Sequence, residues 1–303
     1  MTFGGTGAGR QRPLRVDRPS VLLAACVLLL AAAACTPSPR AATVVADASE
    51  CRDVLLVAAR GSSAPIRSKE VVSMWSSFTA ALPGRSVELV ELGDLNGDGQ
   101  LDRGGYTAVE ALQAPAVDLA ANPEDTDVVF IGGYNQSRRI GTLELVQLLR
   151  SRGRTCPMQR LVLAGYSMGA HATGVALRRL PTSVTSRIDA VEFFGDPSFM
   201  LGPWARVPKG SITAGHGFLG PRPQYVPAAF AARTESWCGE WDGLCTGNVV
   251  LSVSQLLPCD VSSLANLPVC QSRHVDYEKW AIPAGMQAAA ARVSAASAAS
   301  PGR

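Results

Sequence analysis

The sequence has little lysine and no apolar run long enough to span a membrane. Lysine occurs three times, at Lys69, Lys209 and Lys279, so arginine carries most of the positive charge. The longest uninterrupted apolar run is the 14-residue segment Val21–Ala34. As a helix this run would rise about 21 Å, whereas the hydrocarbon core of a bilayer is about 30 Å thick. We therefore expect no transmembrane helix.

An excess of charge of one sign is also lacking from most of the chain. The formal net charge of the 303 residues is +3, but four of the 28 basic residues and one of the 25 acidic residues precede Cys35. The rest of the chain therefore carries 24 of each. A neutral chain lacks the electrostatic signature of a nucleic-acid-binding protein, and we predict no nucleic-acid partner. With 47% hydrophobic residues, the chain is also too apolar for a disordered protein.

The N-terminal segment has the pattern of an export signal. Four arginines precede the apolar run Val21–Ala34, which predicts a signal peptide over residues 1–35. Ala32-Ala33-Ala34 before Cys35 resembles a lipobox, so Cys35 is a candidate for lipidation, and residues 36–50 would form a linker. The alternative is ordinary cleavage near Ala48. A lipid anchor on Cys35 would be the protein's sole attachment to a membrane.

Short apolar runs alternate with longer stretches of helical periodicity over the remaining chain. The candidate strands are Val54–Ala58, Val87–Leu92, Val128–Ile131, Leu161–Ala164 and Ala190–Phe194. Alternation of strand and helix favours the α/β class, with a central parallel sheet covered by helices on both faces. At the C-terminal end, we expect a last helix to about Val293 within an Ala/Ser-rich tail over residues 288–303.

One candidate strand leads directly into a Gly-x-Ser-x-Gly motif. Gly165, Ser167 and Gly169 follow the run Leu161–Ala164, and a helical stretch continues to about Leu180. This order is typical of a nucleophile elbow, in which the serine occupies a sharp turn at a helix N-terminus. Ser167 is therefore the candidate nucleophile.

A serine nucleophile needs a base, and the sequence contains three histidines. His171 lies four residues after Ser167 on the same helix, where its side chain is poorly placed to reach the serine hydroxyl, so we expect it to pack or be solvated. His274 follows every candidate acid and therefore satisfies the chain order Ser, Asp, His. An alternative set pairs His216 with Asp196.

Five motifs resemble, in order, those of the cutinase family of small serine esterases. They are Cys51-Arg-Asp-Val-Leu-Leu-Val-Ala-Ala-Arg-Gly-Ser62, Gly165-Tyr-Ser-Met-Gly169, Phe194-Gly-Asp-Pro197, Cys238-Gly-Glu-Trp-Asp-Gly-Leu-Cys245 and His274-Val-Asp-Tyr277. The resemblance extends over roughly Cys51 to Ala281 and implies an α/β-hydrolase-type fold. We place the catalytic domain at residues 51–287.

The resemblance also implies a role for each matching residue. Ser167 would attack an ester carbonyl, His274 would transfer the proton, and Asp242 would orient the imidazole. The backbone N–H of Met168, which replaces the family's usual glutamine, and the N–H and hydroxyl of Ser62 would form the oxyanion hole. No cofactor is expected for this chemistry.

The cysteines after Cys35 form an even set of six, as expected in an oxidising compartment. The resemblance implies the disulfides Cys51–Cys156 and Cys238–Cys245. Cys259 and Cys270 are left over and would pair with each other. Metal ligation by these cysteines is disfavoured because the sequence has no Cys-x-x-Cys spacing.

A second motif has the spacing of a calcium-binding loop. The first nine of the loop's twelve positions match, with oxygen ligands at 1, 3, 5 and 9 and a glycine at 6. The candidate ligands are Asp94, Asn96, Asp98, Gln100 and Asp102. Position 12, which should carry a bidentate carboxylate, is Gly105, so the site is incomplete unless an acid such as Glu110 folds in. The alternative is a polar turn. A bound calcium would be structural.

Together these features predict a secreted or envelope-anchored, monomeric carboxylic ester hydrolase. The resemblance implies substrates with hydrophobic acyl groups or polymeric esters, and residues 110–133 are long enough to cover part of the site. One alternative is a triad hydrolase of other specificity, acting on acetylated polysaccharide, phospholipid or thioester. The other is an inactive envelope lipoprotein that binds calcium or lipid.

Overall fold

The computed structural model describes residues 51–109, 132–207, 215–240, 242–247, 274 and 276–299. All of them belong to one compact unit. The elements are β1 Val54–Ala59, α1 Lys69–Ala81, β2 Val87–Glu91, α2 Gly132–Thr155, β3 Arg160–Tyr166, α3 Met168–Leu177, α4 Thr182–Thr185, β4 Ile188–Phe194, β5 Ala205–Arg206, the 3-10 helix Ala228–Arg233, β6 Thr234–Trp237, α5 Gly243–Thr246 and α7 Tyr277–Ala298.

Six parallel strands form one sheet in the order β2-β1-β3-β4-β6-β5. The predicted α/β class with a parallel sheet is confirmed. Four of the predicted strands correspond to β1, β2, β3 and β4, whereas the predicted strand Val128–Ile131 lies outside the described residues. Chain order reverses between the neighbouring strands β1 and β3, so the carboxyl ends of these two strands form the expected ligand crevice of an open α/β sheet.

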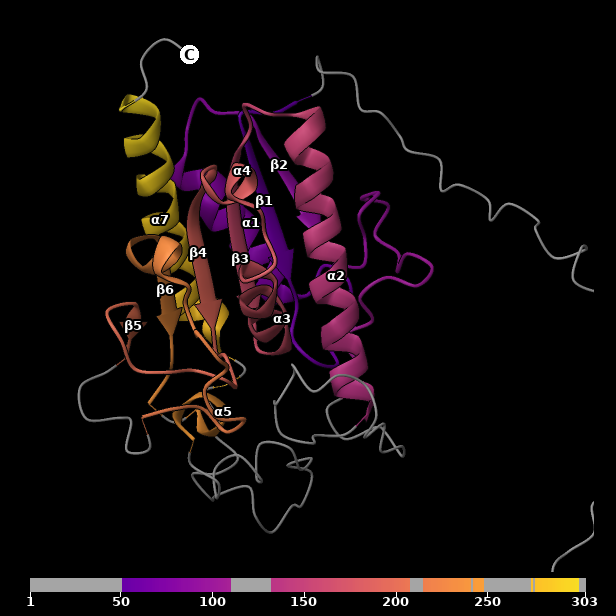
Figure 1. The fold of residues 1–303 in the computed structure, drawn as a ribbon, viewed down its shortest axis with the longest axis vertical. Coiled ribbons are helices and arrows are strands. Elements are labelled where there is room, and N and C mark those ends of the chain that lie inside the picture. The colour runs from indigo at the N-terminus through magenta and orange to yellow at the C-terminus, as the bar shows by residue number, and fades with distance from the viewer. Residues whose placement is uncertain are drawn as a thin grey trace, which may run out of the picture. The chain divides into compact units, whose positions relative to one another are not determined.

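Helices cover both faces of the sheet (Figure 1). Alternate side chains of β1 point to opposite faces, so Leu55 and Val57 join a core under α2 and α3, while Leu56 and Ala58 join a core under α1 and α7. All six residues of β1 are buried, which explains why its sequence is continuously apolar rather than alternating. No helix among the described residues is long and apolar enough to span a membrane.

The C-terminal helix differs from its prediction. Helix α7 runs without a break from Tyr277 to Ala298 and crosses the domain boundary predicted at residue 287. Ala289, Ala290 and Val293 are buried in the core that α7 shares with α1. Alanine favours helix, and its small side chain allows close packing, so the apparent tail is a structural part of the domain.

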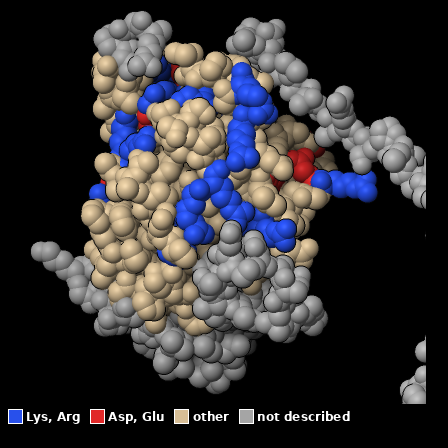
Figure 2. Space-filling model, in the orientation of Figure 1, with Lys and Arg blue, Asp and Glu red and all other residues tan. Residues whose placement is uncertain are grey.

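Charge is unevenly distributed despite the balanced total. Helix α2 contains five arginines, Arg138, Arg139, Arg150, Arg152 and Arg154, and one acid, Glu144. Figure 2 shows a band of Lys and Arg side chains on the viewed face, where few acidic side chains are visible. The neutral sum therefore conceals a local excess of positive charge.

A disulfide joins Cys51, just before β1, to Cys156, just before β3. Replacing both cysteines by serine is expected to lower the free energy of unfolding by about 4.7 kcal/mol, because the bond closes a loop of more than one hundred residues in the unfolded chain. The same change at Cys238 and Cys245, which are seven residues apart in the sequence, should lower the free energy of unfolding by about 2.5 kcal/mol. Urea unfolding of both double variants would measure the difference, and equal losses would contradict the loop-closure explanation.

Candidate active site

Ser167 occupies a strained turn between β3 and α3. Its φ of +54° lies in the left-handed region that non-glycine residues rarely adopt. The turn is tight: a Cβ on Gly165 would lie 2.6 Å from the backbone nitrogen of Ala170, and one on Gly169 would lie 2.2 Å from the carbonyl oxygen of Ala59. Both glycines are therefore required by close backbone approach, and the turn has the geometry of a nucleophile elbow.

Three of the predicted residues form a continuous hydrogen-bonded chain. The Nε2 atom of His274 lies 3.0 Å from the hydroxyl oxygen of Ser167, and its Nδ1 atom lies 2.8 Å from Oδ2 of Asp242. Asp242 is fully buried, while the histidine side chain is 12% exposed. The structure thus brings together Ser167 at the end of β3, Asp242 just before α5 and His274 just before α7. This arrangement suits proton transfer from the serine hydroxyl to the histidine.

Asp242 caps the short helix α5. Its Oδ1 atom accepts hydrogen bonds from the backbone N–H groups of Leu244 at 2.9 Å and Cys245 at 3.4 Å. Burial alone would raise the pKa of Asp242, but the charge of His274 and hydrogen bonds from His274, Tyr277 and Cys245 lower it below its ordinary value. The carboxylate is therefore held ionised and oriented by a loop that the Cys238–Cys245 disulfide closes.

Tyr277, the last residue of the His274-Val-Asp-Tyr277 motif, is a fourth member of the site that the motif alone does not assign a role. Its hydroxyl donates to Oδ2 of Asp242 at 2.7 Å and accepts from the N–H of Gly239 at 2.9 Å. Burial, together with the charge of Asp242, raises the pKa of Tyr277 well above its usual value, so this group stays a proton donor. Its position three residues after His274 was the available sequence signal.

Two further contacts hold the histidine. The Tyr166 hydroxyl donates to the carbonyl oxygen of His274, and the two rings lie 5.2 Å apart between centroids. Gly195, with φ of +60°, lies so close that a Cβ there would be 3.1 Å from both Oδ2 of Asp242 and Cε1 of His274. The motif Phe194-Gly-Asp-Pro197 therefore supplies a glycine where a side chain would collide with the histidine and aspartate.

The predicted oxyanion residues belong to the start of α3 and to the loop after β1. Met168 is the first residue of α3, and its fully buried side chain packs in the core under α2 and α3. Ser62 follows Gly61, where an added Cβ would lie 3.1 Å from Cβ of Ser167 and 2.7 Å from the Tyr166 ring. The loop after β1 therefore runs directly against the turn that carries Ser167.

The other histidines have different surroundings. His171 is buried, and its Nδ1 atom lies 3.1 Å from the Tyr134 hydroxyl. This position agrees with the expectation that His171 packs in the interior and does not take the serine proton. His216 is exposed, and its Nδ1 lies 2.8 Å from the carbonyl oxygen of Gly217.

The acid of the alternative set is engaged elsewhere. Asp196 accepts from the Arg222 guanidinium at 2.6 Å and from the Tyr225 hydroxyl at 2.9 Å. All three side chains are buried, so the carboxylate serves a salt bridge inside the protein. The set of His216 and Asp196 is therefore not assembled in this structure.

The calcium prediction is not supported. Within the described ranges, no group of three or more His, Cys, Asp or Glu side chains could hold a metal ion. Oxygens of the candidate ligands instead accept backbone N–H groups of their own loop: Asp94 from Gly99, Asn96 from Asp98, Asp98 from Gln100 and Asp102 from Leu95. Asp and Asn readily cap turns in this way, so the spacing reflects a polar turn.

Several predictions concern residues outside the described ranges. They are the signal peptide over residues 1–35, lipidation of Cys35, the pairing of Cys259 with Cys270, and most of the cover predicted over residues 110–133.

Comparison with protein families and curated sequences finds similarity to cutinases and other esterases. The family model for cutinases matches residues 116–257. The carboxylesterase Culp1 of Mycobacterium tuberculosis is 26% identical over 212 residues, which cover 69% of this chain and 76% of the relative. Acetylxylan esterase 2 of Talaromyces purpureogenus is 30% identical over 126 residues, which cover 37% of this chain and 52% of the relative.

Solved structures agree on the fold. The catalytic core domain of an acetyl xylan esterase from Trichoderma reesei superposes with a TM-score of 0.50 at 20% identity, covering 81% of this chain and 99% of that structure. An acetylxylan esterase determined at 0.90 Å resolution gives a TM-score of 0.50 at 18% identity, with coverage of 81% and 98%. At these identities the similarity concerns the α/β-hydrolase fold alone.

Proposed function

We propose that the chain is a carboxylic ester hydrolase of the cutinase family and works through the triad Ser167, His274 and Asp242. The observation that carries the proposal is the hydrogen-bonded chain from the Ser167 hydroxyl through both ring nitrogens of His274 to the Asp242 carboxylate. An inactive lipid- or calcium-binding protein would have no need to keep these three groups aligned.

The reaction proceeds in two steps through an acyl-enzyme. The Ser167 oxygen attacks the ester carbonyl carbon while Nε2 of His274 takes the hydroxyl proton, and the same proton then passes to the departing alkoxide. Water attacks the acyl-serine in the second step, with His274 again taking and returning a proton. Asp242 stabilises the charged imidazole and fixes its Nδ1 proton toward the carboxylate.

The negative charge that develops on the carbonyl oxygen needs hydrogen-bond donors. The backbone N–H of Met168 begins helix α3, where N–H groups lack partners within the helix and the helix dipole favours negative charge. The backbone N–H and the hydroxyl of Ser62, in the loop after β1, complete the set of oxyanion donors. No cofactor takes part in these steps.

The proposed substrate is a carboxylic ester with a hydrophobic acyl group or a polymeric ester, so purified protein should hydrolyse p-nitrophenyl esters with a maximum above the acetyl ester. Release of p-nitrophenolate across increasing acyl lengths would measure this preference. Absence of turnover at every acyl length would overturn the proposed function.

Acetylated polysaccharide is the second candidate substrate, because two acetylxylan esterases are among the similar structures. Acetate release from acetylated xylan, measured beside the p-nitrophenyl series, distinguishes the two. A preference for the acetyl group in both assays would replace the proposed substrate class while leaving the ester-hydrolase reaction intact.

We place the enzyme outside the cytoplasm. The two disulfides Cys51–Cys156 and Cys238–Cys245 fit an oxidising compartment.

A further inference from the structure

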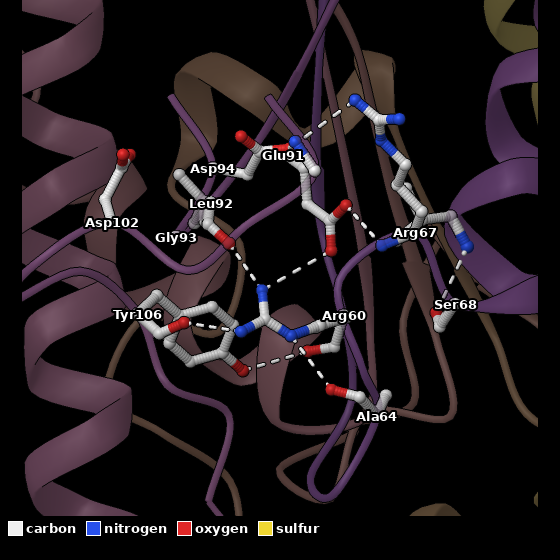
Figure 3. Close-up of polar contacts among 12 residues, drawn as sticks. Arg60, Ala64, Arg67, Ser68, Glu91, Leu92, Gly93, Asp94, Asp102 and Tyr106 are labelled. Atoms are coloured by element: carbon white, nitrogen blue, oxygen red, sulfur yellow. Dashed lines mark hydrogen bonds and ion pairs between the residues drawn. The ribbon is translucent and has the colours of Figure 1, made fainter. Parts of the chain in front are cut away.

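Arg60, the residue directly after β1, is a buried hydrogen-bond hub. Its side chain is 2% exposed, and its Nε atom donates to the carbonyl oxygen of Ala64 at 2.9 Å. One terminal nitrogen donates to the carbonyl oxygen of Leu92 at 2.6 Å, and the other to that of Tyr106 at 2.7 Å (Figure 3). A single planar guanidinium thus joins its own loop, at Ala64, to two later segments, at Leu92 and Tyr106.

Glu91 supplies the counter-charge and a second attachment. Its Oε1 atom lies 3.4 Å from Arg60, and its Oε2 atom accepts the backbone N–H of Arg67 at 2.8 Å. Arg67 has a φ of +57°, a conformation that needs external support in a non-glycine residue. The loop from Arg60 to Arg67 is therefore fixed at its beginning, at Ala64 and at its end.

The acceptors for Arg60 are themselves rigidly held. Both ends of the loop formed by residues 93–106 bind one carboxylate: Glu144 accepts the N–H of Gly93 at 3.1 Å and that of Tyr106 at 3.0 Å. The Tyr106 hydroxyl returns a hydrogen bond of 2.9 Å to the carbonyl oxygen of Arg60. The polar loop that resembles a calcium site is thus closed onto α2 and presents its carbonyl groups to the guanidinium.

The loop that Arg60 fixes is the one that carries Ser62. A Cβ added to Gly61 would meet Ser167 and the Tyr166 ring, so the loop runs close to the nucleophile. A small shift of this loop would therefore move the Ser62 donors relative to the reacting carbonyl. Displacing a catalytic group by about 1 Å can lower a rate by about 100-fold. Arg60 itself is too deeply buried, and too fully used by carbonyl acceptors, to touch a substrate.

We propose that Arg60 is a positioning residue: bound between Glu91 and the 93–106 loop, it sets the distance of the Ser62 donors from Ser167. This inference rests on the proposed ester hydrolysis and on Ser62 as an oxyanion donor. Lysine cannot replace it, because an ammonium group lacks the planar set of donors that reaches Ala64, Leu92 and Tyr106 together.

Steady-state kinetics of Arg60→Lys test the proposal. We expect kcat for a p-nitrophenyl ester to fall by about 10- to 100-fold with KM changed less than about two-fold, because only the transition state uses the oxyanion donors. Arg187→Lys is the matched control: Arg187 also donates to backbone carbonyls, those of Cys156 and Gln159, but at the opposite end of the sheet. Its kcat should stay near that of the wild type.

Tyr106→Phe provides a milder second variant, for use if Arg60→Lys does not fold. It removes one hydrogen bond, from the Tyr106 hydroxyl to the Arg60 carbonyl, and keeps the ring in the core. We expect a smaller fall in kcat, again without a change in KM. Wild-type kcat in a folded Arg60→Lys or Tyr106→Phe variant overturns the proposal.

A double variant separates positioning from general loss of stability. If Arg60 acts through Ser62, then Ser62→Ala should lower kcat much less in the Arg60→Lys background than in the wild type. Fully multiplicative effects of the two substitutions would overturn the proposal even if each variant is slow.

Hydrogen exchange makes the test independent of the reaction. Amide groups of residues 61–67 should exchange faster in Arg60→Lys than in the wild type, and at the wild-type rate in Arg187→Lys. Absence of turnover by the wild type would overturn the proposed function, whereas unchanged exchange in Arg60→Lys would overturn the positioning role.

Discussion

Replacement of Ser167 by alanine is expected to lower kcat for p-nitrophenyl esters by about 10⁵- to 10⁶-fold, with little change in thermal stability. The substitution removes the oxygen that forms the acyl-enzyme but leaves the elbow intact, because the backbone N–H of Ser167 still donates to the Phe194 carbonyl oxygen. Initial rates and thermal melting of the variant and the wild type measure the two quantities.

Ser198→Ala is the matched control for this variant. Ser198 is also buried, and its hydroxyl makes no hydrogen bond to any described residue, so its loss should leave kcat nearly unchanged. A reactive phosphonate ester should add its mass to the wild type and to Ser198→Ala but not to Ser167→Ala. Wild-type activity in the Ser167→Ala variant would show that another residue is the nucleophile.

His274→Ala is expected to lower kcat about as strongly as Ser167→Ala, because the serine and the histidine of a triad act as one unit. His216→Ala should leave kcat within about two-fold of the wild type, since its exposed ring contacts its own neighbour Gly217 rather than Asp196. Initial rates of the two variants at a fixed pH measure the contrast.

The reverse pattern would require the set of His216 and Asp196 to be the catalytic one. A third variant, the double substitution His274→Ala with Ser167→Ala, should be no slower than either single variant. A further large loss in the double variant would mean that the two residues do not act together.

The core strands were predictable because each is a short apolar run that needs no distant information. Strands Val54–Ala59 and Ile188–Phe194 are buried along their whole length. Their residues are therefore apolar, with the exceptions of Asp189 and Glu192. Helix α7 was harder to delimit. Its alanines resemble a low-complexity tail, and only their packing against α1 identifies them as part of the core.

The polar loop after β2 shows the limit of motif spacing. The same Asp and Asn positions that suggest calcium ligation also suit a turn whose side chains cap its own N–H groups, and the sequence does not distinguish the two. The outcome depends on the directions of the side chains, which are set by closure of the loop onto Glu144 and Arg60.

The sequence by itself predicted the chemistry that we propose, from a Gly-x-Ser-x-Gly turn after a buried strand and a histidine after the candidate acids. Its balanced charge after Cys35 gave no sign of a nucleic-acid partner, and its longest apolar run is shorter than a membrane-spanning helix. The tertiary structure decided between the two histidine alternatives, placed Tyr277 and Gly195 beside Asp242 and His274, and showed which segments Arg60 joins. Those choices depend on contacts between segments separated by many residues, and local sequence carries no record of such distances.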